Sequence, residues 1–133
     1  MPPLTIIDNE YASLVYYPEL KIVHHVWHKP ISGERFREVL NKGAELFAQN
    51  HASKWLSDDR ANSALPEEDG EWGMNDWFPR VMQAGWKFWA LVVPEDIMGR
   101  MNMKQFVDHY FEQGLRIMVF TDPAEAMKWL ESQ

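Results

Sequence analysis

Cysteine is absent from the 133 residues of this chain, which excludes disulfides, thiolate zinc sites and thiol nucleophiles. No apolar run reaches the roughly 18 residues that a membrane-spanning helix needs. The basic residues form no stripe, and the net charge of -7 opposes contact with a phosphate backbone. We therefore expect a chain that neither spans a membrane nor binds nucleic acid.

Motifs for metal, phosphate or covalent chemistry are also scarce. The glycines are scattered, so they form no phosphate-binding loop. The acidic run from Glu67 to Glu71 favours the first turn of a helix, because a calcium loop needs a different spacing. Ser57, Asp58 and Asp59 would need a distant His to make a hydrolytic set, and the chain has no G-x-S-x-G turn. We expect no cofactor, no metal and no catalytic residue.

Length and composition are those of one globular domain. Hydrophobic residues make up 46% of the chain and charged residues 25%, which are ordinary values for a folded protein. The first residues, MPPLT, lack the charged and apolar regions of a signal peptide. We therefore expect a single domain over residues 1–133 in the cytoplasm, where the absence of cysteine fits a reducing compartment.

Hydrophobic periodicity and turn residues predict alternating strands and helices. The expected strands are Tyr11–Tyr17, Leu20–His28, Lys54–Asp58, Phe88–Val93 and Leu115–Phe120. The expected helices are Gly33–Gln49 after a cap at Ser32, Pro66–Ala84 with a break near Gly73 and a new cap at Asn75, Met103–Gln113 after a cap at Asn102, and one from Asp122 to about Glu131. The order β-β-α-β-α-β-α-β-α predicts an α/β fold, with a mostly parallel sheet of about five strands and an antiparallel N-terminal hairpin at its edge.

The stretch KIVHHVWHKP holds His24, His25 and His28, which raises the question of a metal site. In a strand, His25 points away from the other two, and these lie roughly 13 Å apart at about 3.3 Å per residue. Zinc needs nitrogen atoms about 2.0 Å from the ion, so the strand assignment argues against chelation. Half-exposed or hydrogen-bonded strand histidines are the simpler interpretation.

Aromatic residues and methionine are the unusual part of the composition. Tryptophan and phenylalanine crowd residues 72–89, and Met98, Met101 and Met103 follow. Most of these side chains should form the core, but a domain of this size has difficulty hiding all seven tryptophans. The remainder could line a ligand cleft or a dimer face, and the sequence leaves both open.

Three stretches resemble the STAS or SpoIIAA-like family of small bacterial proteins. They are KWLSDD before a polar loop, NDWFPRVMQAGWKFWALVVPED, and the closing IMVFTDPAEAMKWLES, and the similarity extends from about Tyr11 onward. The resemblance implies the fold of anti-sigma-factor antagonists, which is akin to that of lipid-binding CRAL-TRIO domains. It also implies a phospho-acceptor serine where a helix begins after the third strand, for which Ser63 is the first candidate and Ser57 the second.

The fold also predicts where a binding site should lie. Open parallel sheets bind ligands beyond the carboxyl ends of their strands. The residues that follow these ends are therefore the candidates for a ligand or partner site. They are Asp58, Arg60, Asn62, Pro94, Met98, Met101 and Thr121, with the two methionines as a mobile apolar wall.

We expect a non-enzymatic regulatory or protein-interaction module. The alternative is a carrier or sensor of a small apolar, lipid-like ligand, which the Trp and Met content and the CRAL-TRIO kinship favour. A carrier should enclose an apolar pocket on the order of several hundred Å³. An interaction module should be filled inside and should expose an apolar patch. Homodimerisation stays open at this point.

Overall fold

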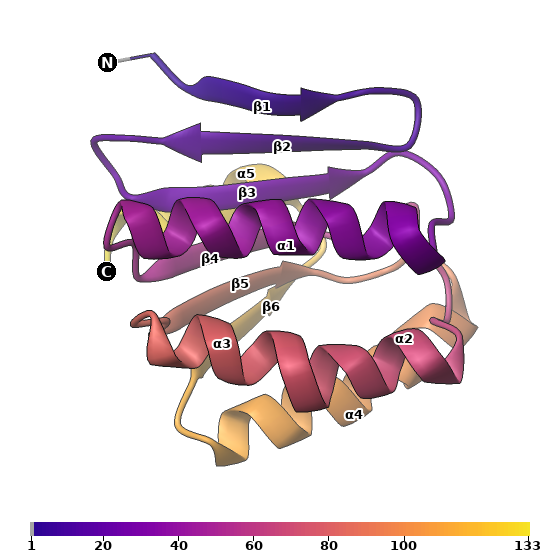
Figure 1. The fold of residues 1–133 in the computed structure, drawn as a ribbon. Helices are drawn as coiled ribbons and strands as arrows, with labels where there is room; N and C mark the ends of the chain where they lie inside the picture. The colour runs from indigo at the N-terminus through magenta and orange to yellow at the C-terminus, as the bar shows by residue number, and fades with distance from the viewer. Residues whose placement is uncertain (1) are drawn as a thin grey trace.

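The computed structural model describes residues 2–133 and shows one mixed sheet with helices on both faces (Figure 1). The sheet has six strands that lie in the order in which they occur in the chain. They are β1 (Leu4–Asp8), β2 (Ala12–Tyr17), β3 (Ile22–Trp27), β4 (Lys54–Asp58), β5 (Phe88–Val92) and β6 (Arg116–Phe120). The first three strands pair antiparallel, and β3 to β6 pair parallel.

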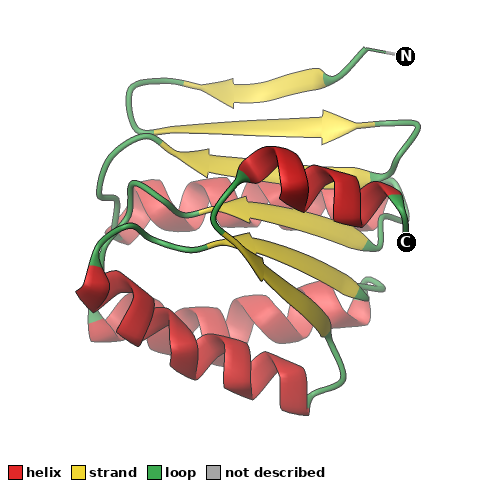
Figure 2. Ribbon diagram, turned by 180° about the vertical axis from the view of Figure 1, so that it is seen from behind, coloured by secondary structure: helices red, strands yellow, loops and turns green. Residues whose placement is uncertain are grey.

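The helices divide unequally between the two faces. They are α1 (Gly33–Gln49), α2 (Glu67–Trp72), a π-helical segment η1 (Gly73–Trp77), α3 (Phe78–Gln83), α4 (Ile97–Glu112) and α5 (Pro123–Glu131). Helix α1 and the continuous α2–η1–α3 segment lie on one side of the sheet, and α5 lies on the other (Figures 1 and 2). Strands β1 and β6 are the two edges of the sheet.

Strand alternation separates the core into two clusters. On the α1 side, Trp55, Trp89 and Leu91 face Phe47 and other aromatic residues, and they form the larger cluster. On the α5 side, a smaller cluster contains buried residues of β3, β4, β5 and α5 (Ile22, Leu56, Ala90, Val92, Ala126 and Leu130). Strands β4 and β5 are therefore apolar on both faces, which is typical of central strands covered by helices.

The α/β class and the mixed sheet are confirmed, but the strand count and the edge differ from the prediction. Strand β1 was not predicted, and it pairs with β2, so the predicted hairpin of β2 and β3 does not form the edge. Two prolines precede β1, and a bulge between Thr5 and Ile7 breaks its alternation. A strand this short with a broken period gives little signal in the sequence.

The predicted break at Gly73 does not occur. The backbone continues from α2 through η1 into α3, and Asn75 lies exposed inside η1 rather than capping a new helix. Proline at position 79 lacks the N–H that an α-helix needs and would crowd the carbonyl of the preceding turn. The π turn just before it widens the helix, because Phe78 N–H bonds the Gly73 carbonyl.

Helix α4 begins at Ile97 rather than at Met103. Asp96 is its N-cap, and its carboxylate accepts a hydrogen bond from Met98 N–H over 3.1 Å. Asn102 therefore lies within the helix, and its side chain accepts a bond from Leu65 N–H instead. Among residues 2–133, no helix is both long enough and apolar enough to cross a membrane.

Candidate functional site

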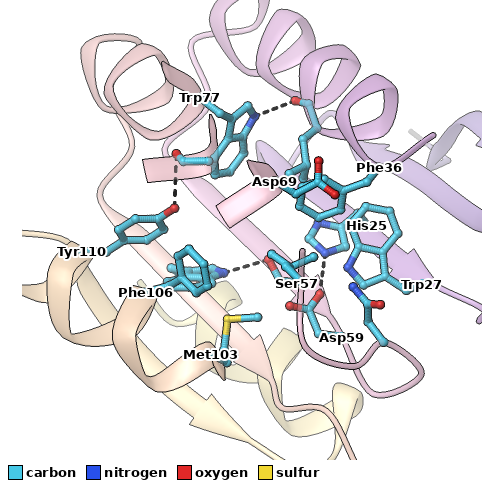
Figure 3. Close-up of a pocket in the computed structure, with 15 residues that line it drawn as sticks. His25, Trp27, Phe36, Ser57, Asp59, Asp69, Trp77, Met103, Phe106 and Tyr110 are labelled. Atoms are coloured by element: carbon cyan, nitrogen blue, oxygen red, sulfur yellow. Dashed lines mark hydrogen bonds and ion pairs between the residues drawn. The ribbon is translucent and has the colours of Figure 1, made fainter. Parts of the chain in front are cut away.

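A cavity of about 60 Å³ lies between the sheet and the helices at the carboxyl ends of β3 and β4. Polar and aromatic side chains from both strands and from α1, α2, η1 and α4 line it (Figure 3). The residues around it are His25, Trp27, Phe36, Leu40, Ser57, Asp59, Asn62, Leu65, Asp69, Gly73, Trp77, Trp89, Met103, Phe106 and Tyr110. Open parallel sheets bind ligands at the carboxyl ends of their strands, and the cavity lies at such ends. Most of its lining residues, however, were not predicted.

His25 forms the polar floor of this cavity together with Asp59. Trp55 Nε1 donates a hydrogen bond to His25 Nδ1 over 3.0 Å, and an indole N–H can only donate. Nδ1 therefore carries no proton, the imidazole is neutral, and its Nε2–H donates to Asp59 Oδ1 over 2.7 Å. Trp55 thus fixes the tautomer and orientation of His25.

Within residues 2–133, Asp59 has no cationic partner, because His25, which donates a hydrogen bond to it, is neutral. The Asp59 side chain is 6% exposed, and no described group donates a hydrogen bond to its second oxygen, Oδ2. The nearby guanidinium groups bind other acids, since Arg60 pairs with Asp58 and Arg37 with Asp69. Asp59 is consequently a buried carboxyl whose hydrogen-bonding capacity is only partly used.

Ser57 lies beside His25 in the parallel register of β3 and β4, yet the two side chains do not act as a nucleophile and base pair. The Ser57 hydroxyl accepts a hydrogen bond from Trp89 Nε1 over 2.8 Å. Both nitrogens of His25 are already engaged, one by Trp55 and one by Asp59. A general base needs a free nitrogen facing the hydroxyl proton, and this arrangement offers none.

Aromatic rings form the walls of the cavity. In Figure 3 the rings of Trp77, Phe106 and Tyr110 lie across the view from His25 and Asp59. Trp77 Nε1 donates to the Leu40 carbonyl over 2.8 Å, which ties η1 to α1. Burial raises the pKa of Tyr110, and its hydroxyl donates to the Gly73 carbonyl. These two hydrogen bonds tie η1 to α1 and to α4 and so hold one wall of the cavity in place.

Asp69 joins α2 to the start of α1. Its Oδ2 accepts a hydrogen bond from Gly33 N–H over 2.8 Å, and its Oδ1 accepts one from Arg37 Nε over 3.1 Å. Ser32 occupies the N-cap position of α1 as predicted, but its side chain makes no capping bond. The carboxylate from α2 caps α1 in its place, where it also meets the positive end of the helix dipole.

Replacing Asp69 with alanine should lower the free energy of unfolding by about 2 kcal/mol, because it leaves the α1 terminus uncapped and Arg37 unpaired. Urea denaturation followed by tryptophan fluorescence measures this loss. Glu68→Ala is the matched control, since Glu68 is an exposed neighbour in the same helix. Equal stability of the two variants would show that Asp69 is not the cap.

Asp58 and Arg60 of the predicted site form an ion pair on the opposite side of β4 from the cavity. Arg60 Nε and one of its terminal nitrogens bind the two Asp58 oxygens over 2.9 and 2.8 Å. This hydrogen bonding raises the pKa of Arg60. Pro94 is buried nearby, and the Arg60 carbonyl accepts a bond from Glu95 N–H. The Arg60 backbone, rather than the ion pair, therefore joins the loops after β4 and β5.

The other predicted site residues separate. Asn62 turns inward to the cavity, where its Oδ1 accepts a bond from Ile31 N–H over 3.1 Å. Thr121 is exposed after β6. Met98 and Met101 were expected in a loop as an apolar wall, but they lie on α4 with exposed fractions of 61% and 66% and do not line the cavity. The earlier start of α4 explains this correction.

The two candidate phospho-acceptors have different surroundings. Ser57 is buried and bonded to Trp89. Ser63 is half-buried, and its hydroxyl donates to the Asp96 carboxylate. Helix α2 begins at Glu67 with Pro66 as its cap, so Ser63 lies ahead of the helix rather than at its terminus. A phosphate on Ser63 would face the Asp96 carboxylate and be repelled by it.

The strand conformation of residues 22–27 is confirmed, and as a result the three histidine side chains point to different parts of the structure. His24 lies on the α5 side, His25 faces the cavity, and His28 is exposed with its Nε2 near the Ser13 hydroxyl, 2.8 Å away. Burial lowers the pKa of His24 to about 4, and its Nε2 is buried without a hydrogen-bond partner. Within the described chain, no three His, Asp or Glu side chains gather in a group that could hold a metal ion.

Comparison with known proteins found no match among protein-family models, curated proteins or solved structures.

Proposed function

We propose that this chain is a non-enzymatic, regulatory protein-interaction module that binds an extended segment of a partner protein along β6. The observation that carries the proposal is the location of its exposed apolar side chains. Apart from Leu4 and Leu20, all the large exposed apolar residues of the described chain lie on α4 and β6. They are Ile97, Met98, Met101 and Phe111 of α4 and Met118 and Val119 of β6, and we use the name β6-edge surface for these six residues, of which only the last two lie on the strand itself.

Strand β6 supports an extended partner because its outer edge is unpaired within the described chain. It pairs with β5 alone, so the backbone groups along its other side can accept a further strand. Strand β1 at the opposite edge carries a bulge, which protects an edge against pairing. Strand β6 has a regular register, and Met118 and Val119, which point to opposite faces, are 44% and 49% exposed.

The interior favours this proposal over a carrier of a lipid-like ligand. The aromatic cavity measures about 60 Å³, far below the several hundred Å³ (on the order of 300 or more) that a drug-sized ligand occupies. Its floor also carries buried polar groups, which suit an apolar ligand poorly. The exposed methionines of α4 offer adaptable contacts on the outside instead.

We propose further that the chain is a SpoIIAA-like domain acting in the cytoplasm. The alternation of strand and helix after β3 and the antiparallel N-terminal strands support this proposal, together with the sequence stretches that resemble the family. The absence of cysteine fits a reducing compartment.

A photo-crosslinking amino acid at Val119, introduced in the native host, tests the β6 edge. We expect crosslinks to a different protein, whose crosslinked peptide is extended and apolar at alternate positions. The matched control is the same group at Thr5 on the opposite edge, where we expect no such product. Crosslinks to a second copy of this chain, or equal products at both positions, would contradict the proposal.

Met118→Lys then tests the contact with the purified partner. A charge on the open edge should weaken binding at least about tenfold, because edge lysines block strand addition. The fold should persist, since this side chain is 44% exposed. Unchanged affinity of a folded Met118→Lys variant would rule out β6 as the binding edge.

A further inference from the structure

We infer that the aromatic cavity binds a small organic cation, a protonated primary amine with its nitrogen at Asp59 and its carbon atoms among the aromatic rings. This site is separate from the β6-edge surface, because none of the six residues of that surface lines the cavity. The inference therefore does not depend on the proposed protein partner.

The first argument for this ligand is the unpaired charge of Asp59 at the floor of the cavity. A buried carboxylate is costly unless it is paired with a cation. Trp55 holds His25 in its neutral form, so His25 donates a hydrogen bond to Asp59 but supplies no charge. Within residues 2–133, no Lys or Arg side chain pairs with Asp59. An ammonium group has three donors and a positive charge, and it would meet both needs of Asp59.

The second argument is that aromatic rings form the walls of the cavity. The rings of Trp27, Phe36, Trp77, Trp89, Phe106 and Tyr110 line the cavity. The faces of such rings are electronegative and attract a cation within about 6 Å of their centroids, most strongly for tryptophan. A carboxyl floor with aromatic walls thus favours a cation that carries some apolar surface over a hydrated metal ion.

Size and access define the ligand class. A cavity of about 150 Å³ holds benzene, so the 60 Å³ available here suit an amine of about two or three heavy atoms. Leu65 and Met103 are half-buried, whereas the other lining residues, apart from Gly73, have exposed fractions of 7% or less. These two side chains therefore form the entrance, and the flexible methionine suits that position.

Titration of the protein with methylammonium chloride, monitored by the indole N–H resonances of Trp55 and Trp89, tests the site. We expect saturable shifts with a dissociation constant on the order of 1–10 mM, which is realistic for so small a ligand. Methanol has the same size and no charge, and sodium chloride controls for ionic strength. The inference would be overturned if methanol shifted the indole resonances as much as methylammonium does. It would also be overturned if methylammonium caused no shift at concentrations up to about 100 mM.

Asp59→Asn provides the matching variant. The amide oxygen can still accept the His25 hydrogen bond, while the charge is lost. We expect affinity for methylammonium to fall at least about tenfold. Asp108→Asn, which removes an exposed charge from α4, should leave affinity unchanged. Equal affinity of Asp59→Asn and the unmodified protein would contradict the site, and the methanol comparison holds even if this variant fails to fold.

Discussion

Gly43→Ala should destabilise the protein by about 3 kcal/mol, although alanine is the better helix former. A β-carbon at position 43 of α1 would lie within 2.9 Å of Trp55 Cζ2 and closer still to Cη2. Trp55 has no room to move, because it is fully buried against Phe47, Trp77 and Trp86. Its Nε1 is also held by His25. Urea denaturation measures the loss.

Two further variants isolate the cause. Ala48→Gly at an exposed position of the same helix should cost about 1 kcal/mol, which gives the intrinsic helix preference alone. In a Trp55→Phe background the space beside position 43 opens, so Gly43→Ala should become neutral or stabilising there. A Gly43→Ala effect that is the same in both backgrounds would show that Trp55 is not what requires glycine.

Stability should fall by about 3 kcal/mol as the pH drops from 6.5 towards 4, because of His24. Burial lowers the pKa of His24 to about 4, with the charge of Asp58 opposing the shift. The ordinary His pKa is about 6.5, so between these values the unfolded chain binds a proton that the folded chain does not. The free energy of unfolding therefore rises with pH across this window.

His24→Leu isolates this effect, since leucine fills a similar volume and does not titrate. The pH dependence of the variant should be flatter than that of the unmodified protein between pH 6.5 and about 4, and the difference between the two curves is the measured quantity. The other four histidines, His25, His28, His51 and His109, are present in both proteins, so the comparison isolates His24. Parallel curves would show that His24 has the same pKa in the folded and the unfolded protein, which would contradict this account.

Local pattern was enough to predict the elements that have a regular period. Helix α1 has the predicted bounds because Phe36, Leu40 and Phe47 recur at helical spacing. Strand β4 also has its predicted bounds. The Asp122 cap of α5 was predicted from Asp, Pro and Glu at its start, and its carboxylate accepts a bond from Ala124 N–H as expected.

Tertiary context decided the features that the sequence could not reveal. Gly73 looks like a helix breaker, but the backbone continues through the π turn, which also accommodates Pro79 and keeps one continuous segment. Gly99 lies inside α4, ahead of the predicted start of this helix, and lets α4 pass close to Pro94, since a β-carbon there would lie 2.8 Å from Pro94 Cβ. Each residue type is ambiguous alone, and its neighbours in space determine its role.

The cavity lies at the carboxyl ends of the strands, where the sequence predicted a site, but most of its lining residues were not predicted. His25 and Asp59 meet only through the parallel register of β3 with β4. That pairing joins residues 34 positions apart in the chain. The usable signal was strand alternation, which places His25, Trp27, Ser57 and Asp59 on the same face of the sheet.

The mass of the protein from its native host, measured under native and then denaturing conditions, tests the central claim most directly. The account predicts a complex with a different protein chain, with no bound molecule of lipid size. Mass lost on denaturation that corresponds to one lipid-like molecule per chain, with no partner protein, would contradict it and establish a carrier.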